Sequence, residues 1–75
     1  MAARINVKGP QGNVFYILGV AKDFLRQLNR AGITDGPDVE TLNDVLKNFR
    51  QMDYDGILNA LESTDLFVFT GRGKR

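Results

Sequence analysis

The stretch Lys8-Gly-Pro-Gln-Gly-Asn13, followed by the apolar run from Val14 to Ala21, decides the fold predicted for this chain. Gly9-Pro10 ends a preceding strand, because proline lacks a backbone N–H and has a fixed φ. Gly12 can adopt the positive φ that a tight turn requires. Asn13 is a favoured N-cap, since its side-chain oxygen can accept a hydrogen bond from a free N–H of the first helical turn. We therefore expect a turn that leads into a long helix.

This long helix is expected from about residue 14 to residue 31. Gly32 suits the C′ position that ends it. Gly19 costs about 1 kcal/mol relative to alanine inside a helix, so we expect another backbone to approach the helix closely there. Apolar residues recur every three or four positions and predict one buried face. The members of this face are Val14, Ile17, Leu18, Ala21, Leu25 and Leu28, with Phe15, Tyr16, Val20 and Phe24 widening it.

Shorter elements flank this helix. Residues 3–8 alternate between apolar and polar side chains, which is the pattern of a half-buried strand. A second helix is expected over about residues 38–51, with Pro37 suited to its first turn. Asp53 is expected to cap a third helix that ends near Ser63 and Thr64, whose side chains compete for backbone hydrogen bonds. Residues 66–69 have the composition of a closing strand.

The predicted order is strand-helix-helix-helix-strand, an α+β fold. We expect the two terminal strands to pair and to pack on the central helix, because a two-stranded sheet is marginal on its own. Residues 1–70 are expected to form one domain and residues 71–75 a flexible basic tail. A 75-residue domain buries only about 60% of its surface. Regular helix packing or oligomerisation is therefore the expected source of stability.

The composition argues against catalysis. The chain contains no His and no Cys, and Ser63 is its only serine, so the usual nucleophile and base pairs cannot be assembled. Zinc and copper sites nearly always use His or Cys. We predict a non-enzymatic protein with no catalytic residues, metal, cofactor or small-molecule substrate. It shows neither a signal peptide nor the ~20 apolar residues of a membrane span, and we expect it in the cytoplasm.

Charge is segregated along the chain. Residues 1–34 carry five basic side chains and one acidic one, residues 35–65 carry eight acidic and two basic, and residues 66–75 carry three basic. Two interpretations stay open. The blocks either face each other or form solvated helix faces, or they form separate surfaces of one sign that partners can bind.

Lys8, Gly12 and Asn13 form a candidate anion site. Free N–H groups at a helix N-terminus suit a phosphate or a carboxylate. The turn lacks the Gly-Lys-Ser/Thr ending of a phosphate-binding Walker loop. A purely structural turn is the alternative.

Lys22, Arg26 and Arg30 are a candidate nucleic-acid surface, which we call the basic stripe. Their spacing of four residues places them along one side of the long helix, where like charges cost some helix stability. A phosphate backbone would balance them, as would solvent or the acidic residues of the second helix. Three further cations in the tail could extend this surface: Arg72, Lys74 and Arg75.

The closing strand is a candidate partner surface. Both its faces are apolar, and if helices cover one of them the other is open to a partner or to a second copy of this chain. The four residues concerned are Leu66, Phe67, Val68 and Phe69. Coverage by loops and the tail is the alternative to a homodimer.

Two motifs carry a resemblance. Gly9-Pro10-x-Gly12-Asn13-x-Phe15, and the later Asp53-Tyr54-Asp55 with Ile57-Leu58, resemble a family of small uncharacterised proteins of bacteriophages and prophages, over roughly residues 5–69. The resemblance implies a mobile-element origin and assigns no residue a role. We expect an interaction module that binds a host or phage protein, with an accessory nucleic-acid binder as the alternative.

Overall fold

The computed structural model describes residues 2–72. Over these residues the elements are β1 (Ala3–Asn6), the 3₁₀ turn η1 (Pro10–Gly12), α1 (Val14–Arg30), α2 (Pro37–Asn48), the 3₁₀ turn η2 (Phe49–Gln51), α3 (Tyr54–Glu62) and β2 (Phe67–Thr70). This confirms the predicted α+β class and the strand-helix-helix-helix-strand order. The expected second helix is split, because its last turn tightens into η2.

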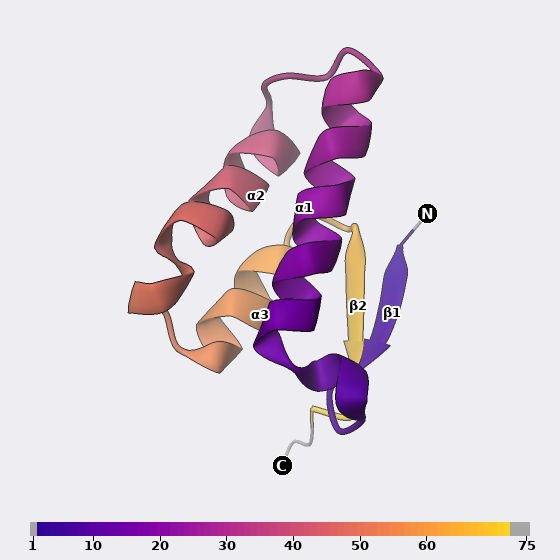
Figure 1. Ribbon diagram of the computed structural model, residues 1–75, viewed down its shortest axis with the longest axis vertical. Coiled ribbons are helices and arrows are strands. Elements are labelled where there is room, and N and C mark those ends of the chain that lie inside the picture. Colours follow the sequence, from indigo (N-terminus) through magenta and orange to yellow (C-terminus); the bar gives the residue numbers. More distant parts are fainter. Residues whose placement is uncertain (1, 73–75) are drawn as a thin grey trace.

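β1 and β2 pair in parallel, with Ile5 opposite Phe69. Parallel neighbours need a long crossover connection, which the three helices supply. Figure 1 shows the two strands together on one side of the molecule, with α1 running between the sheet and α2 in this view. Because side chains alternate along a strand, Phe67 and Phe69 face the helices and Val68 faces away from them.

The starts of α1 and α3 and the end of α3 carry the side-chain caps that the sequence predicts. The Asn13 side chain accepts a hydrogen bond from the N–H of Phe15 at 2.7 Å, and that of Asp53 accepts one from the N–H of Gly56 at 2.7 Å. Each side chain therefore satisfies a donor that the helix itself leaves free. At the end of α3 the Ser63 and Thr64 hydroxyls donate to the carbonyls of Ala60 and Leu61, both at 2.6 Å.

The core lies between the sheet and the three helices. Phe67 links these layers, since its ring meets that of Phe24 edge-on at 5.3 Å and stacks with Phe69 at 5.5 Å. Such aromatic pairs stabilise a core beyond the area that they bury. The buried cluster consists of Ile5, Ile17, Leu18, Ala21, Leu42, Val45, Ile57, Leu58, Leu61, Phe67 and Phe69.

Gly12 is required by close packing. Its φ is not positive, so the expected reason for a glycine here was wrong. A Cβ at this position would collide with the backbone of Val7. The Tyr54 hydroxyl also donates to the Gly12 carbonyl at 2.5 Å, which fixes the start of α3 against the turn. The turn therefore joins β1, α1 and α3.

Two expectations for α1 were wrong. Phe15 and Tyr16 are exposed, at 70% and 43%, so they do not widen the buried face. Gly19 has open space around it: a Cβ placed there would meet no heavy atom within 4 Å. No other described backbone approaches α1 at this glycine. Both differences concern the same outward side of α1.

Candidate functional site

The glycine turn keeps its backbone donors for internal bonds. The N–H of Gly12 donates to the Gly9 carbonyl at 2.9 Å, and that of Asn13 donates to the Pro10 carbonyl at 3.4 Å. The Asn13 side chain caps Phe15, and the backbone N–H of Lys8 donates to the side chain of Asn6 at 3.0 Å. An anion would have to compete for these groups, so the geometry favours the structural interpretation of the turn.

The basic stripe is exposed on α1, and it does not pair with the acidic residues of α2. Within residues 2–72 no salt bridge joins the two helices. Arg26 contacts Asp23 of its own helix at 3.5 Å, and both side chains are about two-thirds exposed (65% and 66%). Such a surface pair contributes little to stability. Lys22, Arg26 and Arg30 therefore face solvent rather than acids of the second helix.

Arg72 does not belong to a free tail. Its guanidinium contacts Glu62 at 2.8 Å and Asp55 at 3.5 Å, both on α3. The other carboxylate oxygen of Glu62 accepts from the N–H of Phe69 at 3.4 Å, so the same side chain also holds β2. These ion pairs argue against a flexible Arg72, whereas its contact with nucleic acid stays a prediction. Lys74 and Arg75 lie outside the described residues.

The closing strand offers less surface than predicted. Phe67 and Phe69 are only 3% and 7% exposed, because they lie in the core, so they cannot form a partner surface. Val68 is 39% exposed on the outer face of the sheet, beside its cross-strand neighbour Arg4. Leu66 is partly buried against the core. The predicted dimer surface is thereby reduced to one exposed valine and one half-buried leucine.

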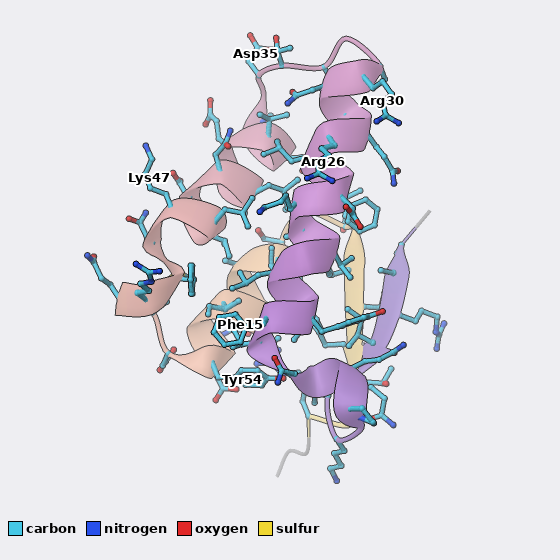
Figure 2. The ribbon with its side chains drawn as sticks, in the orientation of Figure 1. Phe15, Arg26, Arg30, Asp35, Lys47 and Tyr54 are labelled. Atoms are coloured by element: carbon cyan, nitrogen blue, oxygen red, sulfur yellow. The ribbon has the colours of Figure 1, made fainter. Side chains whose placement is uncertain are left out.

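A groove lies between α1 and the segment where α2 passes into η2. It has a volume of about 310 Å³, and we call it the aromatic groove. Phe15 and Phe49 form one end, with ring centroids 6.4 Å apart in an edge-to-face arrangement. Figure 2 shows Phe15 at the first turn of α1, on the side away from the sheet. The lining residues are Phe15, Leu18, Gly19, Lys22, Leu46 and Phe49.

Gly19 opens the wall of the aromatic groove. It lies one helical turn after Phe15 and one turn before Lys22 and Asp23 on the outward side of α1. It also lines a neighbouring hollow on α1, together with Tyr16 and Asp23. A glycine here destabilises α1, while the folded chain itself leaves the space beside it unfilled. Its presence has no explanation within the described fold.

One cation lines the aromatic groove, and two more lie near it. Lys22 forms part of its wall, and Arg26 lies one turn further along α1. On the opposite bank, the Arg50 guanidinium lies 5.5 Å from the centroid of the Phe49 ring, a cation–π contact. The acidic side chain of Asp44 lines a different groove, between α2 and α3. Basic side chains therefore lie on both banks of the groove, Lys22 from the basic N-terminal segment and Arg50 from the acidic segment.

The sequence missed Phe15, Leu46, Phe49 and Arg50 as site residues. An apolar residue in an amphipathic pattern is expected to be buried, so Phe15 was not expected at the surface. The one sequence feature that could have indicated this site is Gly19, which lies at helical spacing between Phe15 and Lys22.

Comparisons with protein-family models, with curated proteins and with solved structures found no match. None of the helices in residues 2–72 combines the length and the apolar character needed to cross a membrane.

Proposed function

We propose that this chain is a non-enzymatic interaction module that binds a partner protein through the aromatic groove. The exposure of Phe15 carries the proposal. A phenylalanine that leaves 70% of its surface in water gives up stabilisation that burial would supply. Exposed aromatic side chains beside a hollow are typical anchors of protein interfaces. The resemblance to small phage and prophage proteins supports a host or phage protein in the cytoplasm as the partner.

Site-specific photo-crosslinking tests this function. A photoreactive phenylalanine analogue at position 15 is expected to give a discrete protein adduct in the cells from which the chain derives. The same analogue at position 68, on the outer face of the sheet, is the matched control. Equal adducts from both positions would refute the groove as the binding surface. An adduct to nucleic acid from position 15 would refute a protein partner.

An accessory nucleic-acid binder is the second candidate. The observation that favours it is the solvent exposure of Lys22, Arg26 and Arg30 together with the neighbouring ring of Phe15. Cations that follow a phosphate backbone, beside an aromatic ring on which a base can stack, are the elements of single-strand binding. A gel shift that is lost on replacement of the three basic residues by glutamine would support this candidate. Absence of a shift at low salt would exclude it.

A further inference from the structure

The aromatic groove has the form of a helix-binding site. α1 and α2 are joined by the short loop 31–36 and lie next to each other (Figure 1), and the lining of the aromatic groove covers two turns of α1, from Phe15 to Lys22. Its apolar lining comes from Phe15 and Leu18 on one bank and from Leu46 and Phe49 on the other. An amphipathic helix docks in such a groove through apolar residues spaced three or four apart.

Gly19 also favours a helix as the segment that binds in the groove. The distance between two packed helices depends on the side chains at their contact. With no Cβ at Gly19 and no described atom filling that position, a ridge of side chains on another helix can lie directly against α1. An extended segment would gain little from one missing methyl group in the middle of a groove.

The charges select the chemistry of the partner. Lys22 and Arg26 stand one turn apart on α1, and Arg50 stands across the groove over Phe49. Asp23, which contacts Arg26, lines the neighbouring hollow, and Lys47 points away from α1 in Figure 2. Resting on the proposed function, we propose that the groove binds an acidic amphipathic helix of the partner protein, with carboxylates flanking its apolar anchors.

A second copy of this chain is a poorer occupant. Two aromatic grooves placed face to face would bring Lys22, Arg26 and Arg50 of both copies together. Like charges across an interface are unfavourable and select against the wrong partner. An acidic helix instead places opposite charges on both banks.

Three synthetic peptides of about 20 residues, a length that can form a helix, test this inference. They share leucine anchors at helical spacing and differ only in flanking glutamate, glutamine or lysine. Each is titrated into the ¹⁵N-labelled chain, and a single-stranded oligonucleotide is titrated in parallel. We expect the glutamate peptide to shift the amides of Gly19, Lys22 and Leu46 and to bind about tenfold more tightly than the lysine peptide.

Charge reversal supplies the control. Lys22→Glu combined with Arg50→Glu should remove the preference for the glutamate peptide, and Arg4→Glu on the outer sheet face should leave it intact. Equal binding of all three peptides at the groove would overturn the inference and leave the proposed function standing. Shifts with the oligonucleotide alone would overturn both. The absence of any shift at the groove would also overturn the inference, while crosslinking from position 15 tests the proposed function separately.

Discussion

Replacement of Gly19 by alanine should stabilise the chain. The position lies in the interior of α1, it is exposed, and an added Cβ meets nothing within 4 Å. The gain is therefore the difference in helix propensity between glycine and alanine, about 1 kcal/mol. For a domain of this size that corresponds to a rise in melting temperature of roughly 4–8 °C. The native glycine would then lower the free energy of unfolding relative to alanine.

Thermal and urea unfolding followed by circular dichroism measure this effect, with coincident transitions as the check on two-state behaviour. Gly12→Ala is the matched control, because the same substitution there forces a Cβ into the Val7 backbone. Overpacking of this kind costs about 1–3 kcal/mol. The two variants should shift in opposite directions. An unchanged or lower melting temperature for Gly19→Ala would refute the claim that nothing in the fold requires this glycine.

Four further variants test the fold by the same unfolding measurements. Phe67→Ala should lower the free energy of unfolding by about 3–5 kcal/mol, because it removes the contact between the sheet and α1. Val68→Ala, on the outer face, should lower it by less than about 1 kcal/mol. Equal losses would contradict the assignment of the strand faces. Asp53→Ala should cost about 1 kcal/mol through loss of the α3 cap, and a neutral result would remove that role. Arg72→Gln should lower stability by less than about 1 kcal/mol, and the loss should shrink in 1 M salt; a salt-independent loss would contradict the ion pairs with α3.

The parts of the fold that depend on neighbouring residues could be predicted from the sequence. Asn13 and Asp53 act within one helical turn of themselves, and Ser63 and Thr64 act on the turn before them. These interactions need no information about the rest of the chain. Pro37 begins α2 and Gly32 has a φ of 88°, both as the local pattern indicates.

The parts that depend on distant contacts could not be predicted. The pattern of residues 66–69 is apolar on both faces, so only the packing against α1 and α3 decides that Phe67 and Phe69 are the buried pair. Arg72 pairs with α3 because β2 packs against that helix, where Glu62 also accepts from the N–H of Phe69. Neither contact can be predicted from the residues next to it in the sequence.

The candidate site shows the same limit. The exposed Phe15 follows the helical apolar pattern as well as the buried Ile17 does, so periodicity cannot separate them. The packing of the whole chain separates them, since Ile17 lies in the buried core and Phe15 lines the groove on the surface. The position of the basic stripe on α1 could be predicted. Its lack of ion pairs with α2 within residues 2–72 could not, because helix spacing alone does not place the acids of α2.

Crosslinking in a Gly19→Leu background tests most directly whether the aromatic groove is the binding surface. Leucine is a better helix former than glycine, so the variant should keep or raise the melting temperature while its side chain occupies the space beside α1. With the photoreactive analogue at position 15, we predict that the protein adduct seen with glycine at position 19 disappears in this stable variant. An adduct of unchanged yield and mass would contradict a partner that docks against Gly19.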